Sequence, residues 1–284
     1  MRISGFNLAD YERILDAALE AGYRFYTVSE YVEADAAEEP HVVLRHDVDR
    51  RVGNAVALAE AEAERGVGAT YYFRTSTFEP DIARAMEDRG HEVGYHYEDL
   101  AATRGNVEAA HGRFAENLEL FREYVDVKTA CAHGSPLSPH LNTDMWEDAR
   151  TPEHYDLIGE AYDALEFDAI GLSELLYLSD TGRDWSAHVP GLGDVRSTDD
   201  VVEVVESGAC PALYVLAHPS RWATSRLQAV ERSSWDVAAE AGKVVANGAH
   251  AVQRAGGRFV EGTRVGRAVR SIAAGNVTGV SRRE

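Results

Sequence analysis

Two aspartates stand two positions apart at the end of an apolar segment, Leu44-Arg45-His46-Asp47-Val48-Asp49. If the chain is extended there, side chains two positions apart share a face, so the carboxylates of Asp47 and Asp49 point the same way. Neighbouring carboxylates repel each other unless a cation lies beside them or one of them takes up a proton, and both states are useful in hydrolysis. The alternative interpretation is a pair of loop carboxylates, one of which caps the following helix.

A histidine ends another strand-like segment, Gly90-His91-Glu92-Val93-Gly94-Tyr95-His96. His91 and His96 are five positions apart, so on a strand they point to opposite faces and only one of them can enter a common site. Neutral imidazole binds divalent metals well, and His96 stands at the carboxyl end, so His96 is the candidate ligand. We expect His91 to pack or to form a local hydrogen bond.

Two further histidines follow apolar segments. His133 opens the turn His133-Gly134-Ser135-Pro136, where backbone amides could also stabilise a developing oxyanion. His218 stands between the apolar segment 213–217 and Pro219, and a histidine held there could donate a proton to a leaving group. For each of them a purely structural hydrogen bond is the alternative.

An arginine lies between two acids and beside an aromatic ring in Asp180-Thr181-Gly182-Arg183-Asp184-Trp185. Such a segment could orient a catalytic carboxylate or line a sugar site, and Asp180 and Arg183 are then the orienting residues. An ordinary surface turn explains the same pattern.

The elements that must position these residues alternate along the chain. Periodicity, caps and breakers predict strands at 24–28, 41–47, 68–74, 91–96, 127–133, 156–161, 175–179 and 212–217, and helices at 7–22, 53–65, 81–89, 107–124 and about 233–252. Such alternation predicts an α/β fold with a parallel sheet or barrel. The carboxyl ends of parallel barrel strands converge on one face, where active sites lie, so the acids and histidines above are expected to meet.

Length and composition predict the number of domains, the kind of partner and the salt environment of the protein. At 284 residues the chain is expected to form one domain over 1–284. Its 48 acidic and 28 basic residues give a net charge of −20, which argues against nucleic acid as a partner. Only Lys128 and Lys243 are lysines, a habit of organisms that keep molar salt inside the cell, where strong screening tolerates such charge. An ordinary acidic surface is the alternative.

The chain carries no apolar run long enough to insert into a membrane, and its first ten residues do not read as a secretory signal. We therefore expect a cytoplasmic protein. Cys131 and Cys210 are too few and too far apart for a disulfide framework, and both are expected to be buried and reduced.

Over positions 40 to 220, the order and type of these motifs resemble the polysaccharide deacetylase superfamily, carbohydrate esterase family 4 and its NodB-like relatives. Its Asp-Asp motif is similar to Asp47-Val48-Asp49, its Gly-His-Glu-Ile-Gly-x-His motif to the segment 90–96, and its Leu-x-His motif to Leu216-Ala217-His218. The resemblance implies a distorted, incomplete (β/α)7-type barrel, on which the N-terminal and C-terminal helices pack.

The same resemblance implies roles for individual residues. Asp47 would be the general base, Asp49 and His96 metal ligands, and His218 the general acid, while the segment 180–185 would orient catalytic groups. An Asp and His shell suits zinc, with cobalt, nickel and manganese as alternatives.

Three departures from the family pattern indicate a divergent subfamily. Val48 separates two aspartates that are adjacent in the typical member, which leaves open which of them is the base. The family's second histidine falls at Leu100, so the third ligand is expected to be His133, with Glu98 or water as alternatives. The family's base-orienting arginine is missing from its usual segment, and Arg45 or Arg183 is expected to replace it.

The expected activity is metal-dependent removal of an N-acyl group, such as acetyl, from an amino sugar or glycan precursor. A cytoplasmic location favours a nucleotide-linked or lipid-linked sugar over a finished polymer. The alternatives are a hydrolase of another amide or of a phosphoester, and a non-catalytic sugar-binding relative that has lost its metal.

Overall fold

In the computed structural model, the residues whose structure is described are 5–34, 40–135, 137–147, 150–162, 175–183, 185, 187–225 and 228. All of the elements below belong to the unit Met1–Ala229. The helix predicted near 233–252 lies outside the described residues, so a single domain over 1–284 stays a prediction.

Strands and helices alternate along this unit. The strands are β1 (Arg24–Tyr26), β2 (His41–Val48), β3 (Thr70–Phe73), β4 (Glu92–Tyr97), β5 (Thr129–Ala132), β6 (Gly159–Glu160), β7 (Leu176–Ser179), β8 (Ala187–Val189), β9 (Gly193–Val195) and β10 (Ala212–Ala217). The α-helices are α1 (Leu8–Glu20), α2 (Val28–Glu33), α3 (Val52–Ala63), α4 (Pro80–Glu87), α5 (Asp99–Ala102), α6 (Val107–Arg122) and α7 (Thr198–Ser207). Short 3-10 turns are η1 (Asn142–Glu147), η2 (Pro152–Tyr155), η5 (Thr181–Arg183) and η6 (Pro219–Arg221).

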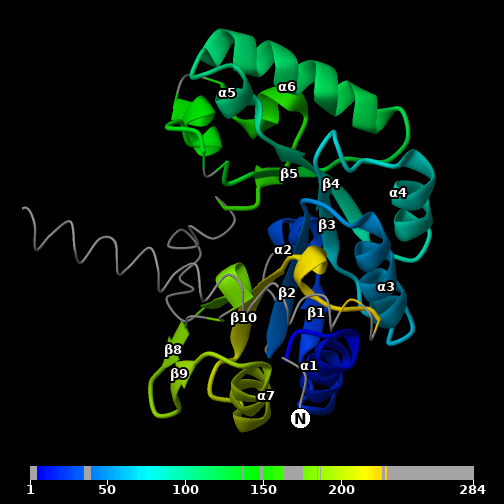
Figure 1. Ribbon diagram of the computed structural model, residues 1–284, viewed down its shortest axis with the longest axis vertical. Coiled ribbons are helices and arrows are strands. Elements are labelled where there is room, and N and C mark those ends of the chain that lie inside the picture. The colour runs from blue at the N-terminus through cyan, green and yellow to red at the C-terminus, as the bar shows by residue number, and fades with distance from the viewer. Residues whose placement is uncertain are drawn as a thin grey trace, which may run out of the picture. The chain divides into compact units, whose positions relative to one another are not determined.

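Eight strands form one sheet in the order β6-β5-β4-β3-β2-β10-β7, with β1 paired to the first half of β2. Every pairing in it is parallel. In Figure 1 the colour changes steadily from β2 to β5, and β10 returns from the end of the described chain to lie beside β2. The sheet curls into a half-barrel, and within the described residues β6 and β7 do not pair with each other. This confirms the predicted fold class, an incomplete α/β barrel of parallel strands.

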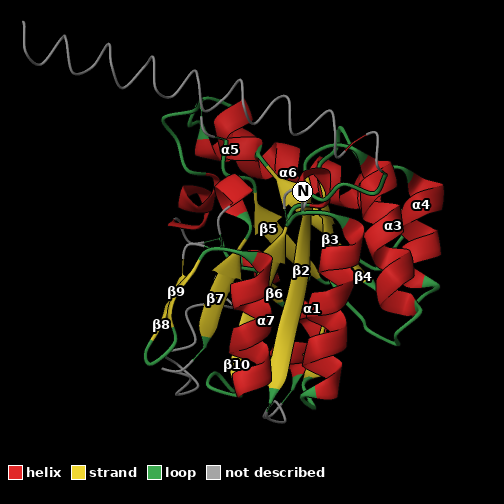
Figure 2. Ribbon diagram, turned by 60° about the horizontal axis from the view of Figure 1, so that its bottom comes forward, coloured by secondary structure: helices red, strands yellow, loops and turns green. Residues whose placement is uncertain are grey.

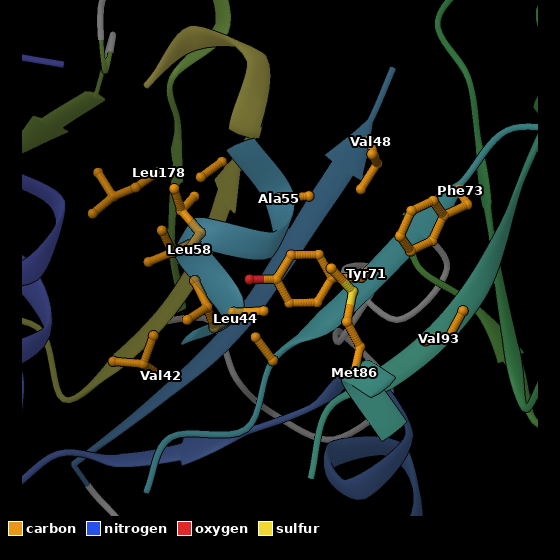
Figure 3. Packing of buried hydrophobic residues seen from close by; sticks show 14 of the residues in the cluster. Val42, Leu44, Val48, Ala55, Leu58, Tyr71, Phe73, Met86, Val93 and Leu178 are labelled. Atoms are coloured by element: carbon orange, nitrogen blue, oxygen red, sulfur yellow. The ribbon is translucent and has the colours of Figure 1, made fainter. Parts of the chain in front are cut away.

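The outer face of the sheet carries the larger hydrophobic core. Figure 2 shows α1 and α7 side by side in front of β2 and β10, with α3 and α4 farther along the same side. Figure 3 shows Val42, Leu44 and Val48 of β2 among side chains of α3, β3 and α4, such as Leu58 and Met86. Side chains two positions apart on β2 thus pack against the helices.

The residues between them on β2 point into the barrel, where Val43 joins a second cluster with Tyr72 and Tyr214. Helix α2 closes the amino end of this interior. Its first backbone N–H groups donate to buried acceptors of neighbouring strands, Val28 to Thr70 Oγ1 at 2.7 Å and Ser29 to Glu92 Oε2 at 2.9 Å. The carboxyl end of the barrel is therefore the end left for a site.

A buried polar network fixes the outer face of β2 to α1 and α3. Glu62 of α3 lies 2.7 Å from His46 Nε2, accepts a hydrogen bond from Tyr71 at 2.7 Å, and accepts another from Tyr11. Burial by itself raises the pKa of Glu62, but His46 and the other partners outweigh it and lower that pKa. The carboxylate is therefore charged and matched by donors, as a buried acid must be.

The structure departs from the predicted elements in several places, and α5 and the β8–β9 hairpin were not predicted. The strand expected at 24–28 ends at Tyr26, because Thr27 caps α2 with a capping box that includes Glu30. Helix α7 lies in a segment for which no element was predicted, although Ser197 and Asp200 form a capping box there too. The strand expected at 156–161 shrinks to β6. Cys131 is buried as expected, whereas Cys210 is only half-buried, and both are free.

The segment 90–96 needs glycine at two positions, each for a different physical reason. Gly90 follows α4 with φ of 90°, a left-handed conformation that suits glycine. Gly94 lies on β4, where a Cβ atom would overlap the Tyr72 ring and stand 2.8 Å from the carbonyl oxygen of Thr129. The side chain of Tyr72 thus occupies the space above Gly94, inside the barrel.

Replacing Gly94 by alanine is expected to lower the free energy of unfolding by about 1–3 kcal/mol, because the added methyl group has no room. Urea denaturation in molar salt measures this change. The matched control is Gly53→Ala in α3, where nothing lies within 4 Å of an added Cβ and alanine favours the helix. Equal stability of Gly94→Ala and the wild type would contradict the packing.

Asp99 joins α5 to α6 as a buried acid. It accepts hydrogen bonds from Tyr95 at 2.8 Å and Asn117 at 2.9 Å, and Arg113 Nε lies 3.0 Å away. Burial nonetheless outweighs these partners and raises its pKa to about 6.

Because this pKa lies above the unfolded value, the protonated form stabilises the fold, and that contribution is lost as pH rises from about 4 through 6. We expect the stability of the wild type relative to Asp99→Asn to fall by about 2 kcal/mol between pH 4 and pH 7. Urea denaturation at each pH tests this. A constant difference between the two proteins would show that burial does not raise this pKa.

Candidate metal centre

The carboxyl ends of four strands bring the predicted residues together. Asp47 lies in β2 and Asp49 directly follows it, where the Asp49 N–H donates to the Asp47 carbonyl at 3.1 Å. His96 lies in β4, and His133 follows β5. His218 follows β10, which pairs with β2.

Asp49, His96 and His133 form the tightest group. Asp49 Oδ1 lies 3.5 Å from Nε2 of His96 and also 3.5 Å from Nε2 of His133. The two imidazole rings are nearly perpendicular, at 84°. One ligand atom from each of these three residues fits within 4.8 Å of the others, which is the spacing of a metal site.

Both imidazoles of this group are held through Nδ1, which leaves Nε2 as the metal-binding atom. Nδ1 of His96 lies 2.9 Å from the Cys131 carbonyl oxygen and donates to it. Nδ1 of His133 lies 3.3 Å from Glu98 Oε2 and 3.2 Å from Ser135 Oγ. Such acceptors behind a ligand histidine fix its tautomer and ring orientation.

Glu98, the alternative third ligand, is occupied elsewhere. Both of its carboxylate oxygens accept hydrogen bonds from Arg74 Nη2, at 2.7 and 2.8 Å. The contact with His133, together with Arg74, outweighs burial and lowers the pKa of Glu98 to about 2. Glu98 therefore lies behind His133 as a charged acceptor, and the geometry favours His133 over Glu98 as the third ligand.

The charges around Asp49 favour a cation. Burial raises the pKa of Asp49, but the neighbouring imidazole of His96 and the charges of His218 and His133 outweigh it and lower that pKa to about 2. Burial lowers the pKa of His96, but the effect of Asp47 and Asp49 is larger, so that the pKa is raised overall. The carboxylates are therefore ionised at neutral pH and attract positive charge to the space beside His96.

Asp49 Oδ1 fits a metal by a second criterion. This oxygen is buried and has no hydrogen-bond partner, although it stands between two imidazoles. A buried carboxylate oxygen without a donor is costly, and a divalent cation would satisfy it. The donor set of one carboxylate and two imidazoles suits zinc.

Asp47 lies deeper, with 3% of its surface exposed. Its Oδ2 is 3.7 Å from His96 Nε2, and its Oδ1 is 3.8 Å from the Cys131 Sγ that donates to it. Asp47, His96 and Cys131 are also close enough to hold an ion. Arg45 Nη1 lies 2.7 Å from Cys131 Sγ, and a guanidinium there disfavours a cation, so we favour the Asp49 group.

Arg45 is fully buried beneath Asp47, with its guanidinium 4.5 Å from the Tyr162 ring centroid. Burial raises the pKa of Asp47, but the charges of Arg45, His96 and His218 outweigh it and lower that pKa. The charge of Arg45 thus acts on Asp47, and a role of Arg45 in orienting the base stays a prediction. The Arg183 side chain lies outside the described residues, so its role stays a prediction.

Asp180 is buried and holds His218 from two sides. Its Oδ1 is 2.6 Å from His218 Nδ1, and its Oδ2 accepts from the His218 backbone N–H at 2.9 Å. Arg221 and the indole of Trp222 each donate to it, both at 2.9 Å. Nδ1 of His218 is therefore engaged, which leaves Nε2 as its second nitrogen. Asp180 contacts His218 directly, and its role in orienting a catalytic group stays a prediction.

Sequence reasoning missed Arg221, Trp222 and Arg74. Arg221 and Trp222 follow His218 by three and four positions, so a turn after Pro219 could have suggested them. The loop-carboxylate interpretation of the aspartates fails, because α3 begins after Arg51 with no side-chain cap. His91 is buried and packs against Tyr71 and α3, as one of its two expected roles, and its Nε2 lies 3.0 Å from the carbonyl oxygen of the distant Ala59.

A cleft of about 730 Å³ opens beside the metal group. Glu98 and His133 form the end nearest the group, and the loop after His133 forms one wall. Its lining residues are Glu98, Ala101, Ala102, Arg104, His133, Ser135, Leu137, Ser138, Pro139 and His140. Within the described residues, no helix is long and apolar enough to cross a membrane.

No family model and no curated protein matches this sequence. Several solved structures resemble its fold. A CE4 family pseudoenzyme from Bacillus anthracis is 14% identical with a TM-score of 0.40, and the match covers 72% of this chain and 63% of that one. A family 4 carbohydrate esterase from Streptomyces lividans, in complex with acetate, is 17% identical with a TM-score of 0.37, covering 63% of this chain and 78% of the other.

A family 4 carbohydrate esterase from Bacillus anthracis is 15% identical with a TM-score of 0.39, and the match covers 80% of this chain and 86% of that one. This chain spans less than two thirds of the length of the pseudoenzyme, 63%. It resembles carbohydrate esterase family 4 in the order of its motifs, and its own strand pairing makes it an incomplete α/β barrel of parallel strands. At these TM-scores the likeness does not establish what the chain does, so its chemistry rests on its own residues.

Alanine at Asp49, His96 or His133 is expected to remove most bound metal, because each change takes away one of three protein ligands. Elemental analysis after incubation with zinc in molar salt measures this, with about one ion per wild-type chain expected. Glu98→Gln should keep the ion but weaken its affinity roughly tenfold, since it loses the charge behind His133.

The control is His188→Ala on β8, an exposed histidine with a side chain 67% accessible that pairs with Asp194, far from the metal group in the sequence of strands. Full metal content in His133→Ala would show that water or another residue supplies the third ligand.

Proposed function

We propose that this chain is a metal-dependent hydrolase that removes an N-acyl group, such as acetyl, from an amino sugar. The observation that carries the proposal is the arrangement of Asp47 and His218 beside the Asp49, His96 and His133 group. The charge of His218 reaches both aspartates and lowers the pKa of each. A base, an acid and a set of metal ligands therefore share one end of the barrel.

Asp49, His96 and His133 would hold the ion, for which zinc is our first choice. A divalent ion bound there supplies an acidic water and polarises a carbonyl group. The chain's own residues supply the remaining chemistry.

Asp47 is the general base in this proposal, since it is ionised, buried and close to His96. It accepts the proton of the attacking water. Arg45 holds the Asp47 carboxylate in its charged form from below, and Cys131 donates to its Oδ1 at 3.8 Å. Asp49 is directed at the two ligand histidines instead, which supports the division of roles between the two aspartates.

His218 is the general acid. Asp180 holds Nδ1, so Nε2 is the nitrogen that donates a proton to the departing amine. Arg221 and Trp222 saturate the Asp180 carboxylate, which therefore orients the imidazole without competing for the proton. This arrangement gives the acid a fixed position relative to the base.

The proposed substrate is a carbohydrate precursor, and the proposed location is the cytoplasm of an organism with molar internal salt. Both cysteines are free, as reducing conditions would leave them. The net charge of −20 with only two lysines supports the salt-rich setting.

A non-catalytic sugar-binding protein is the second candidate, and Leu100 is the observation that favours it. This side chain is buried in the hydrophobic core at the position where the family has a ligand histidine. His133 makes this loss tolerable in the proposed enzyme, so the two candidates differ in whether His133 completes the site.

Acetate release from N-acetylated sugars, measured with zinc-loaded protein in molar salt, tests the proposal. Asp47→Asn and His218→Gln are each expected to lower kcat by about 10²–10⁴, because they remove the base and the acid. Both variants should still bind zinc, which separates a catalytic defect from a lost metal.

His188→Ala again serves as the control and should keep full activity. Zinc binding without acetate release from any acetylated sugar would favour a hydrolase of another amide or of a phosphoester. Failure of the wild type to bind metal would favour the sugar-binding candidate.

A further inference from the structure

The cleft beside His133 differs in charge from the rest of the chain. Its wall holds one carboxylate, Glu98, and this is already neutralised by Arg74 at 2.7 Å. Arg104 lies on the same wall, is exposed, and makes no ion pair within the described residues. In a chain of net charge −20, the cleft therefore presents an uncompensated positive charge.

The turn after α5 places Arg104 on the wall of the cleft. Arg104 follows the last turn of α5 with φ of 55°, a position where glycine or asparagine is usual. A non-glycine residue there costs on the order of 1 kcal/mol. The next residue, Gly105, is also left-handed, with φ of 83°, and the turn that the two residues form carries Arg104 to the cleft wall.

His140 is brought to the same wall by close packing. A Cβ atom on Gly105 would overlap the His140 ring, so the imidazole lies directly on the Gly105 backbone. Ser138 Oγ accepts from the His140 backbone N–H at 3.1 Å and fixes the loop there. Arg104 and His140 thus form a polar group at one part of the cleft, with His133 at its metal end.

We propose that this cleft binds a phosphate group attached to the amino sugar, with Arg104 as the main contact and His140 as its neighbour. The inference rests on the proposed function, because it places the sugar at the metal group and the phosphate farther along the cleft. A guanidinium binds phosphate oxygens strongly and in two-pronged geometry. The cleft's volume of about 730 Å³ leaves room for both parts.

Two sources share this phosphate chemistry, a nucleotide-linked and a lipid-linked sugar. Leu137 distinguishes them, because it lines the cleft with its side chain fully exposed, at 101%. A lipid chain would cover Leu137, whereas a nucleotide would not need it.

Calorimetric binding to metal-free protein tests the proposal without requiring turnover or a phosphate–metal contact. The probes are uridine diphosphate-N-acetylglucosamine, farnesyl diphosphate-linked N-acetylglucosamine and uncharged diacetylchitobiose. At least one phosphate-bearing probe is expected to bind about tenfold more tightly than diacetylchitobiose, and Arg104→Gln should remove that advantage. The control variant Arg89→Gln loses the same charge from an exposed arginine two positions after α4, and it should keep the advantage.

The variant Leu137→Ser distinguishes a lipid-linked from a nucleotide-linked sugar as the source of the phosphate group. A selective loss of affinity for the farnesyl probe supports a lipid-linked substrate, and unchanged affinity for both supports a nucleotide-linked one. Equal affinity for charged and uncharged probes, or tight phosphate binding that survives Arg104→Gln, would overturn the inference. Acetate release is measured separately, so a phosphate site on a protein without deacetylase activity remains recognisable.

Discussion

Each histidine at the carboxyl end of the barrel is held through Nδ1, and the site depends on this constraint. The acceptors differ in kind: a backbone carbonyl for His96, a charged carboxylate for His133 and a buried carboxylate for His218. In all three histidines Nδ1 is engaged by its acceptor, so that Nε2 is the nitrogen left for the site. Without these acceptors, the imidazoles could turn and the distances to Asp49 and Asp47 would not be fixed.

The acceptors in turn depend on the parallel sheet. Pairing of β4 with β5 places the Cys131 carbonyl beside His96, and pairing of β10 with β2 places His218 on the same end as Asp47. Strand β2 is held on its outer face by the Glu62 network and on its inner face by the buried Arg45. A rigid central strand lets two aspartates of like charge remain close, since the surrounding cations and imidazoles outweigh the repulsion.

Charge is distributed unevenly over this acidic chain. Three arginines near the site each contact a particular acid or thiol: Arg45 contacts Cys131, Arg74 contacts Glu98 and Arg221 contacts Asp180. In the proposed mechanism they help to position the base, a ligand histidine and the acid. Arg104 differs because it has no such partner among the described residues. The same physical reasoning therefore assigns the first three to positioning and Arg104 to contact with a ligand.

The sequence by itself determined the alternation of strands and helices, the α/β barrel class and the residues that meet at its carboxyl end. These follow from periodicities of 2 and 3.6 residues and from the rule that parallel strands end on one face. It also determined that His91 and His96 point apart. Such inferences need only local geometry, which the order of residues fixes.

Only the tertiary structure decided which side chains support the site. Glu98 and His133 were rival ligands in the sequence, and their distances to Arg74 and Asp49 separate their roles. Arg221 reaches Asp180 across 41 positions of sequence. Contacts of this kind depend on which distant strands pair. The charge of each acid depends on how deeply it is buried. Neither can be read from the residues of one motif.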